Sequence, residues 1–418
     1  MARKMKDSGI EWIGEIPEGW EVVPVKRLCT MQAGKNLTSE QIAPEGTYPV
    51  YGGNGIRGFF SDYNCVGQFL TVGRQGALCG NVHKINGKVW ATEHAVITAP
   101  SSYAILDFLY YLLIGMDLNQ YVSSTAAQPG LAVGTLLNLK TCYPCSTLEQ
   151  TQISNYLNAK CSEIDTMLSR TRSSIEEYKK LKQAVITQAV TKGVRGEREM
   201  KPTGFTRWSE IPSDWDLKRV KSCVASITSG LSAVTDDTNS EESGNFVLRT
   251  SAVSSGFFVP TEVKPVLKSA VNRLICPVEP DTLIVSRMNT ASMVGACAYV
   301  ANKHPYIFLP DKLWKIKFHP SYHTKYMWYA LNSVPAKSWF SELATGASSS
   351  MQNISTSDFT SNYLPIPAFS EQEEIADYLD AKCAEIDGLI AKKEQLVKEL
   401  ESYKKSLIYE VVTGKREV

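Results

Sequence analysis

The sequence predicts an α+β protein in which two mixed α/β modules are separated by two long helices. Two internal duplications support this prediction. Residues 149–168 match residues 371–390 at eleven of twenty positions with a constant offset of 222. Upstream, residues 14–28 resemble residues 209–223 at an offset of 195. The order is therefore module, helix, module, helix, and it predicts a pseudo-twofold internal repeat.

The length of 418 residues suits two modules with separate hydrophobic cores. The composition, 43% hydrophobic and 21% charged, is that of an ordinary globular protein. The duplications divide the chain into a first module at 1–146, a first long helix and linker at 147–201, a second module at 202–369 and a second long helix at 370–418.

The two predicted helices carry an apolar stripe with heptad spacing, and no proline interrupts it. The stripe comprises Ile153, Leu157, Ile164, Leu168, Ile175, Tyr178 and Val185 in the first helix, and Ile375, Leu379, Ile386, Ile390, Val397, Leu400 and Leu407 in the second. A helix of about forty residues is ~60 Å long and buries only one stripe, so it needs a partner. We expect the two copies to pair as an antiparallel coiled coil. The alternative is that each helix packs only on its own module.

Short runs rich in β-branched and aromatic residues lie between turn residues in both modules. They occupy residues 68–72, 88–91, 246–248, 282–285 and 313–318. Each module also holds one candidate amphipathic helix, at residues 103–118 and at residues 322–331. The modules diverge between their similar ends, which indicates one scaffold with two different recognition surfaces.

Composition also limits the compartment and the partners. The net charge of +1 excludes a strong overall attraction to polyanions, although local basic faces remain open. The N-terminus lacks the apolar stretch of a signal peptide, and the longest apolar run, 103–115, contains Asp107 and is too short to span a bilayer. We therefore expect a cytoplasmic protein without membrane contact, with its ten cysteines reduced.

The sequence lacks enzyme motifs, apart from one C-x-x-C pair whose spacing is typical of redox sites. We find neither a GxxxxGKS/T phosphate loop nor the Asn/Asp-Pro-Pro-aromatic segment of a DNA adenine methyltransferase. His319 and His323 lie four apart without a second ligand pair nearby, so we expect no metal site and no catalytic residues. Cys142 and Cys145 form a C-x-x-C before a helix, but the matching stretch 362–367 has no cysteine. A thiol–disulfide oxidoreductase is therefore a weak alternative.

Three motifs together resemble the specificity subunit of type I restriction–modification systems. They are the opening DSGIEWIGEIPEGWEVVPVKRL, the segment YPVYGGNGIRGFF…GRQGALCGNV…WATEHAV, and the helix opening EQ…I…YL…K…EID, which occurs twice. The resemblance covers essentially the whole chain and its order of modules and helices. The second module departs from the pattern, because Arg287 is followed by Met288 and Asn289 and the GRxG segment of Arg74 is not repeated.

The resemblance implies that each module is a target-recognition domain that reads one half of a split double-stranded DNA site. It implies that the paired helices act as a spacer and dock two modification (methyltransferase) subunits, with restriction subunits as further partners. It also implies a non-catalytic chain without a cofactor of its own. S-adenosylmethionine, and ATP with Mg²⁺ if the complex restricts, are expected on the partner subunits. The competing interpretation is a coiled-coil scaffold with two protein-binding modules.

The geometry of DNA is consistent with a protein that reads a split site through two modules. B-DNA presents the same face every ~34 Å, so two modules on one face need a fixed separation. A stiff helical pair provides that separation better than a flexible linker does. Because the modules differ in sequence, we expect two different half-sites and an asymmetric target.

Base reading favours arginine opposite guanine, and asparagine or glutamine opposite adenine. The candidates in the first module lie in or beside glycine-rich turns and are Tyr51, Asn54, Arg57, Arg74 and Gln75. The candidates in the second module are Arg249, Arg287, Asn289 and Lys312, and the predicted phosphate contacts are Lys35 and Lys84. Arg74 and Arg287 are the first candidates because each ends an apolar β run. Each other candidate is interpreted equally well as a solvated loop residue without a role in binding. We interpret GGNG at 52–55 as a plain turn in preference to a phosphate cradle.

Overall fold

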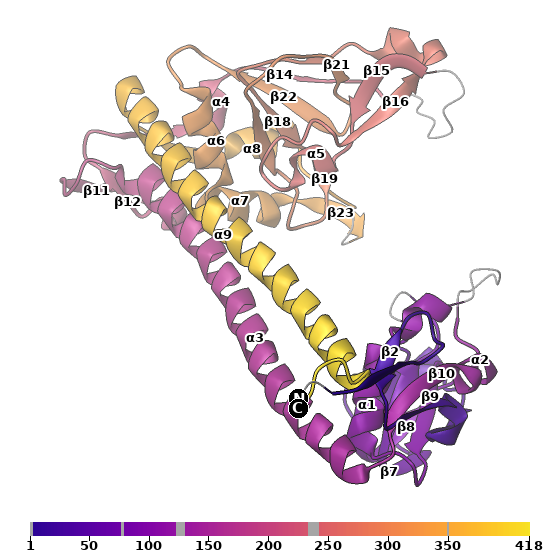
Figure 1. Ribbon diagram of the computed structural model, residues 1–418. Coiled ribbons are helices and arrows are strands. Elements are labelled where there is room, and N and C mark those ends of the chain that lie inside the picture. Colours follow the sequence, from indigo (N-terminus) through magenta and orange to yellow (C-terminus); the bar gives the residue numbers. More distant parts are fainter. Residues whose placement is uncertain (1–2, 77–78, 123–129, 233–241, 349–350) are drawn as a thin grey trace. The chain divides into compact units, whose positions relative to one another are not determined.

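The computed structural model describes residues 3–76, 79–122, 130–232, 242–348 and 351–418. The chain forms two compact units (Figure 1). Unit 1 comprises Met1–Ser173 and Lys393–Val418, and unit 2 comprises Ser174–Lys392. The division falls inside the two long helices, α3 (Thr147–Lys192) and α9 (Phe369–Val412), so each unit contains one module and a portion of each helix.

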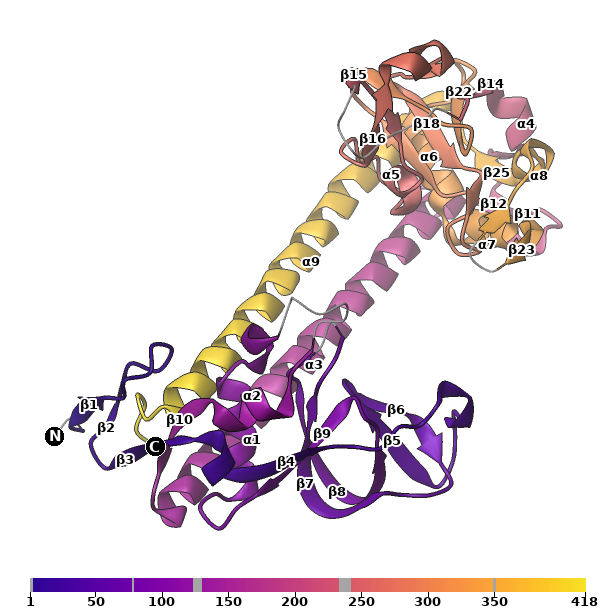
Figure 2. The ribbon, with the colours of Figure 1, turned by 90° about the vertical axis from the view of Figure 1, so that its right-hand side faces the viewer.

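The module of unit 1 is built on a six-stranded sheet with the order β4-β9-β7-β8-β5-β6 (Figure 2). The strands are β4 (Cys29–Ala33), β5 (Tyr48–Gly52), β6 (Gly55–Phe60), β7 (Cys65–Gly73), β8 (Val82–Ala91) and β9 (Ala95–Pro100). β7 pairs antiparallel with β8 from Cys65 to Val72, whereas β5 pairs with β8 in parallel. The last five residues of β7, Phe69–Gly73, are all buried, so the core is centred on this strand.

Shorter elements complete unit 1. Helix α1 (Leu106–Gly115) packs Phe108, Leu109 and Leu112 into the core. The other elements are β1 (Met5–Asp7), β2 (Glu15–Pro17), β3 (Trp20–Pro24), β10 (Lys140–Pro144), α2 (Val133–Asn138) and the 3-10 helices η1 (Val25–Arg27), η2 (Ser39–Gln41) and η3 (Leu118–Tyr121). β1 pairs with β2 and β3 pairs with β10, both antiparallel. The second pair brings the beginning of the module close to the beginning of α3, which follows β10 directly.

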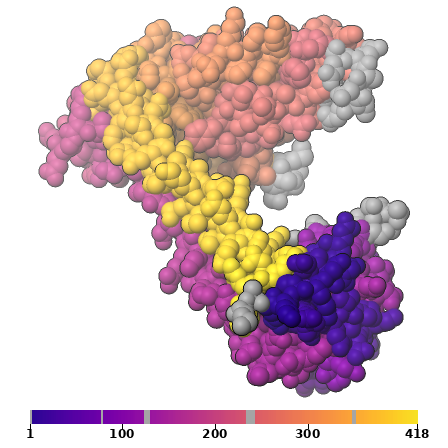
Figure 3. Space-filling model, viewed as in Figure 1, coloured from indigo at the N-terminus to yellow at the C-terminus, as the bar shows by residue number. Residues whose placement is uncertain are grey.

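The two chain ends of unit 1 pack against each other, and the N-terminal segment lies beside the end of α9 (Figure 3). The hydroxyl of Tyr409 donates to the carbonyl oxygen of Trp12 at 2.8 Å. Gly414 follows the end of α9 with φ +71°. It lies so close to the N-terminal segment that a Cβ there would be 2.4 Å from the ring of Pro17. A larger residue at position 414 would push the N-terminal hairpin away from α9.

Unit 2 contains two four-stranded sheets and a three-stranded ribbon. The first sheet is β14 (Val224–Ser229), β22 (Leu313–Phe318), β18 (Thr282–Ser286) and β20 (Cys297–Val300), and the second is β16 (Val263–Leu267), β15 (Glu242–Leu248), β21 (His304–Phe308) and β17 (Pro277–Val278). The ribbon is β19 (Met288–Asn289), β24 (Met351–Asn353) and β23 (Thr345–Ser348). β18 is buried along its whole length and is the central strand of the core.

The remaining elements of unit 2 are two small antiparallel strand pairs and several helices. The pairs are β11 (Met200–Pro202) with β12 (Glu210–Pro212), and β13 (Asp216–Arg219) with β25 (Tyr363–Ile366). The helices are α4 (Val220–Cys223), α5 (Ser251–Ser254), α6 (Thr324–Asn332), α7 (Val334–Leu343), α8 (Thr356–Ser361), η4 (Thr206–Trp208) and η5 (Lys268–Arg273).

Within each unit, α3 and α9 contact each other through apolar side chains and ion pairs. In unit 1, the buried cluster contains Ile164 of α3 and Leu407 of α9, and Lys404 bonds Asp165. The second cross-helix pair of unit 1 is Arg172 with Glu401, so a later residue of α3 meets an earlier residue of α9. The helices are therefore antiparallel in this unit.

Unit 2 repeats this arrangement. Ile186 of α3 shares a buried cluster with Ile375 and Leu379 of α9. Lys182 bonds Asp387, and Arg195, just beyond α3, bonds Glu374. The order along the two helices is again antiparallel.

The internal repeat also shapes the start of each long helix. In unit 1, the indole Nε1 of Trp20 donates to Glu149 at 3.0 Å, and Arg3 bonds the same carboxylate. In unit 2, the indole of Trp215 donates to Glu371 at 3.2 Å, and Arg198 bonds that carboxylate. The duplicated tryptophan and the duplicated glutamate of the sequence are thus partners in one repeated contact.

The predicted strands and helices of both modules are confirmed, and every predicted stripe residue is buried or half-buried. The prediction of one helix in each module was too simple. The structure adds α2 in unit 1 and α7 in unit 2, among others. α7 has a proline in its first turn, at Pro335, where the missing N–H costs nothing. In the sequence that proline reads as the end of a helix.

Candidate nucleic-acid interface

Several candidate residues of unit 1 meet around the short link between β8 and β9. The amide of Lys35 donates to Ala91 at 3.0 Å, and the amide of Thr92 donates to the carbonyl of Tyr51 at 2.9 Å. The amide of Arg74 donates to the carbonyl of His94 at 2.9 Å. Backbone hydrogen bonds therefore hold three separate segments at one place, and the structure brings Lys35, Tyr51 and Arg74 together.

The GGNG segment is the turn between β5 and β6, with Gly52 opposite Gly55 in the strand register. Gly53 lies so close to the neighbouring loop that a Cβ would be 2.9 Å from the carbonyl oxygen of Gln75. The interpretation of GGNG as a turn is confirmed. Asn54 is exposed at its tip, and its side-chain oxygen accepts from Asn81 at 2.8 Å. Asn81 did not figure among the predicted residues.

Arg57 and Gln75 adjoin the same turn. The Arg57 side chain packs over Gly52, where a Cβ would be 2.4 Å from its Cδ. Gln75 forms a β-bridge with Gly130. The backbone of Gln75 and the side chain of Arg57 therefore both lie against the GGNG turn.

Lys84 lies apart from this group. Its Nζ is 2.8 Å from Asp107 and 4.4 Å from the centre of the Tyr110 ring, and it donates to Asn158 at 3.3 Å. The predicted role of Lys84 as a phosphate contact stays a prediction, but its charge already has a partner inside the protein.

In unit 2, the structure brings together three of the four candidates. The amide of Arg287 donates to the carbonyl of Lys312 at 3.1 Å. Asn289 follows on β19, and its amide donates to Ser254 at 3.0 Å. Arg249 lies at the other end of α5, where its Nε donates to Val263 at 3.2 Å. Helix α5 separates it along the chain from Ser254.

Arg74 and Arg287 occupy equivalent positions in the two modules. The carbonyl of Arg74 accepts from Leu131 at 2.9 Å, and the carbonyl of Arg287 accepts from Ile354 at 3.0 Å. The residue before each arginine accepts from a glycine with positive φ, Gly80 at +92° and Gly295 at +78°. The two modules therefore share a local backbone frame at a point where their sequences differ.

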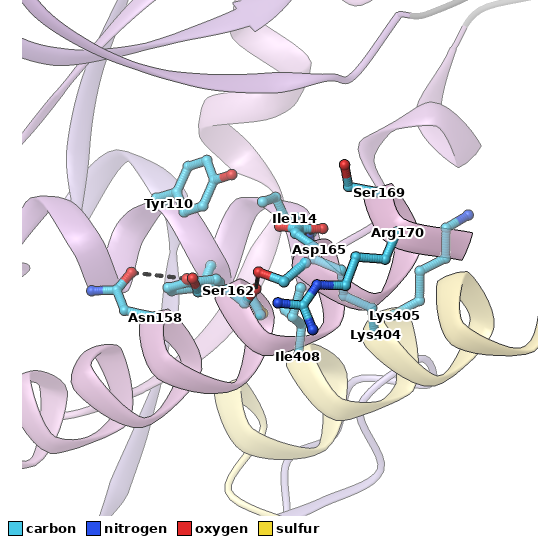
Figure 4. Close-up of a pocket in the computed structure, with 13 residues that line it drawn as sticks. Tyr110, Ile114, Asn158, Ser162, Asp165, Ser169, Arg170, Lys404, Lys405 and Ile408 are labelled. Atoms are coloured by element: carbon cyan, nitrogen blue, oxygen red, sulfur yellow. Dashed lines mark hydrogen bonds and ion pairs between the residues drawn. The ribbon is translucent and has the colours of Figure 1, made fainter. Parts of the chain in front are cut away.

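A groove of about 750 Å³ lies beside α1 in unit 1, lined also by α3 and α9 (Figure 4). Asp165 and Lys404 are paired on its wall, and Tyr111 donates to Asn158 at 2.8 Å. Arg170 and Lys405 add two further cations to the lining. The helical stripe did not predict this groove, because it forms only where α1 meets the helix pair.

The C-x-x-C pair does not have the properties of a redox site. Cys142 is fully buried on β10, and burial raises the pKa of its thiol to about 12. Cys145 is exposed, and desolvation raises its pKa as well. A nucleophilic cysteine needs a lowered pKa, so this pair lacks the activation that thiol exchange requires.

Clusters of metal ligands and membrane-spanning helices are both absent from the part of the chain that the structure describes. Within the described ranges, no three His, Cys, Asp or Glu side chains gather as metal ligands, and His319 and His323 belong to no such group. Across the same residues, no helix combines the length and the apolar composition of a membrane span.

The sequence matches the family model described as the type I restriction modification DNA specificity domain twice, over residues 17–177 and 212–399. The type I restriction enzyme EcoprrI specificity subunit of Escherichia coli is 40% identical over 159 residues, which span 37% of each chain. The putative type I restriction enzyme MjaX specificity subunit of Methanocaldococcus jannaschii is 24% identical over 433 residues, covering 96% of this chain and 95% of that protein.

A solved structure reported for complex assembly and conformational transition of the type I R-M system shares the fold. It has a TM-score of 0.68 at 15% identity and covers 96% of this chain and 99% of that chain. The two family matches cover most of the sequence, and they confirm the family predicted from the motifs. This chain therefore belongs to the type I restriction–modification DNA specificity family, whose members recognise DNA and are not themselves catalytic.

Proposed function

We propose that this chain reads a bipartite, asymmetric DNA site, with one half-site for each module. The observation that carries the proposal is the shared frame of Arg74 and Arg287. A protein that reads two unlike half-sites needs the same backbone arrangement in both modules, with different side chains on it. Asn54 and Gln75 accompany the first arginine, whereas Asn289 accompanies the second.

The helix pair is the proposed spacer. Antiparallel contacts occur between α3 and α9 in both units, and we propose that they belong to one continuous coiled coil with pseudo-twofold symmetry. Cross-helix ion pairs at repeat-related positions, Lys404–Asp165 and Lys182–Asp387, support this proposal. A stiff pair of this kind keeps two modules at a fixed separation, as two half-sites on one duplex require.

Two modification subunits are the proposed protein partners. Each unit exposes apolar side chains on its portions of the long helices, among them Met167 and Tyr403 in unit 1 and Leu389 and Leu181 in unit 2. The offset of 222 relates Met167 to Leu389 and Leu181 to Tyr403. Two similar exposed faces suit two copies of one partner. The groove beside α1 extends such a face in unit 1.

The chemistry of the complex is assigned to the partners. Modification subunits with S-adenosylmethionine flip and methylate an adenine in each half-site, and ATP-dependent restriction subunits with Mg²⁺ join if the complex also cuts. This chain contributes sequence recognition and spacing in the cytoplasm.

Exchange of one module tests the proposal. Residues 1–146 are replaced by the first module of a relative with a different target, and methylated sites are mapped in cells that carry the modification subunit. We expect one half of the target to change while the other half and the spacing persist. An unchanged target, or loss of all sequence preference without loss of assembly, favours a scaffold with protein-binding modules instead.

A further inference from the structure

In both modules, the arginine of the shared backbone frame is held through its Nε atom. The Nε of Arg74 donates to the carbonyl oxygen of Leu131 at 3.2 Å. The Nε of Arg287 donates to the side-chain oxygen of Asn353 at 3.5 Å, which is long for a hydrogen bond. In unit 1, one residue makes both contacts, because the amide of Leu131 also donates to the carbonyl of Arg74. In unit 2, two neighbouring residues share them, because the amide of Ile354, next to Asn353, donates to the carbonyl of Arg287.

This arrangement leaves one particular part of each guanidinium available. A guanidinium has five N–H donors in a planar fork, and the Nε–H is the one already used. Within the described residues, no hydrogen bond engages an Nη atom of Arg74 or Arg287. Both side chains are half-buried, and the Arg287 guanidinium also lies 5.9 Å from the centre of the Trp314 ring. Among the described residues, the end of the fork is therefore without a hydrogen-bond partner, while the Nε–H bond holds its orientation.

We infer that Asn353 is a positioning residue that aims the Nη fork of Arg287 at a pair of acceptors on DNA, and that Leu131 does the same for Arg74 through its backbone. The inference rests on the proposed function. Paired acceptors of the right spacing are the O6 and N7 of guanine or two phosphate oxygens, and both match a fork that binds end-on. Holding the fork before binding reduces the conformational entropy that binding has to overcome.

The two modules differ in whether a substitution can remove the hydrogen-bond acceptor that holds the arginine. Asn353 lies on β24 opposite Met288 of β19, so the strand register sets its position while its side chain supplies the acceptor. In unit 1 the acceptor is a main-chain carbonyl, which no substitution removes. Substitution at position 353 should therefore affect only the half-site of the second module.

The test measures DNA binding by the complex of this chain with its modification subunits. Arg287→Ala, Asn353→Ala, Asn353→Asp and the double variant are compared, with Thr345→Ala as the control. Thr345 is exposed and pairs with Asn353 across β23 and β24, so it reports general damage to the ribbon. Leu131→Met is the control in unit 1, because it keeps the carbonyl. Each variant is titrated with the cognate duplex and with duplexes substituted at every base of one half-site.

We expect Arg287→Ala to weaken binding roughly ten- to hundredfold. Asn353→Ala should weaken it several-fold, Asn353→Asp should restore it, and both controls should bind as the native chain does. Asn353→Ala should have no further effect once Arg287 is alanine. If the losses vanish for duplexes lacking one guanine of the second half-site, the acceptors are on that base. If they persist for every sequence and the slope of log K against log salt falls by about one, the acceptors are on a phosphate.

Two results would overturn the inference. One is native-like binding by Arg287→Ala and Asn353→Ala. The other is a loss from Asn353→Ala that is equally large in the Arg287→Ala background. Failure of the proposed function looks different, because the native complex itself would then show no preference for a bipartite duplex.

Discussion

Lys182 and Asp387 form an ion pair across the two long helices, with Nζ 2.7 and 2.6 Å from the two carboxylate oxygens. Its repeat image is Lys404 with Asp165, at 2.7 Å from both oxygens. The offset of 222 exchanges the two pairs and, with them, the helix that provides the lysine. This exchange is what the proposed coiled coil would produce, because two copies of one segment that pair antiparallel about a pseudo-twofold axis repeat each contact with the helices exchanged. Lys182 lies between the stripe residues Tyr178 and Val185, and Lys404 lies at the equivalent place between Leu400 and Leu407.

Removing the carboxylate of this pair should destabilise unit 2. The Lys182 side chain is only 11% exposed, so Asp387→Ala leaves a poorly solvated ammonium without its main partner. We expect the free energy of unfolding to fall by about 1–2 kcal/mol. The measurement is urea denaturation, and Glu163→Ala is the control. Glu163 pairs with Lys160 on one exposed helix face, and its removal should cost less than about 0.5 kcal/mol. Equal losses from the two variants would contradict the prediction.

The two repeated glutamates should differ in their contribution to stability. Glu371 is 2% exposed in its side chain and binds both Arg198 and Trp215, whereas the side chain of Glu149 is 27% exposed. Glu371→Gln should lower the free energy of unfolding by about 3 kcal/mol, because it removes one charge from a buried pair. Glu149→Gln should cost about 1 kcal/mol. Thermal unfolding of both variants checks the order, and a larger loss from Glu149→Gln would refute it.

Lys337 should destabilise the folded state at neutral pH. Burial lowers its pKa, so between its folded and unfolded pKa values the unfolded chain binds more protons. Stability should therefore rise with pH in the alkaline range below the unfolded value of about 10.4. Lys337→Met should remove this rise and raise the free energy of unfolding at pH 7 by about 1 kcal/mol.

Lys325 is the matched control for Lys337. Its hydrogen bond to Asp380 raises its pKa, so its contribution to stability is present at neutral pH and is lost as pH rises through the folded value. Lys325→Met should therefore lower stability at pH 7. Urea midpoints at pH 7 and pH 10 compare the two variants, and a change of the same sign in both would count against this account.

The two predicted phosphate contacts should behave differently. Lys35 is exposed and belongs to the group around Arg74, whereas Lys84 is paired with Asp107. Lys35→Ala should weaken DNA binding similarly for every sequence and reduce the salt slope by about one. Lys84→Ala should leave that slope nearly unchanged. Filter binding at several salt concentrations gives both slopes, and a larger change from Lys84→Ala would reverse the assignment.

The sequence predicted the elements that local pattern determines. Ile164 and Ile386 were recognisable as stripe positions because helical spacing depends only on neighbours in the chain. The duplicated Trp20 and Trp215 marked equivalent module starts, although nothing in the sequence linked them to Glu149 and Glu371. That link depends on contacts between segments more than a hundred residues apart.

The candidate interface was predicted only in part for the same reason. Arg74 and Arg287 stood out because each ends an apolar strand. Leu131 and Asn353 did not, because strand pairing and a bridging loop bring them to the arginines over 57 and 66 residues. The structure, not the sequence, shows that both modules use the same turn, with Gly80 and Gly295 at positive φ in equivalent places.

The most direct test of the central claim is a map of methylated adenines in DNA from cells that carry this chain and its modification subunit. We expect one asymmetric motif with two unlike halves, separated by a constant number of unspecified base pairs and methylated in both halves. A contiguous motif, or halves at variable separation, would contradict the account.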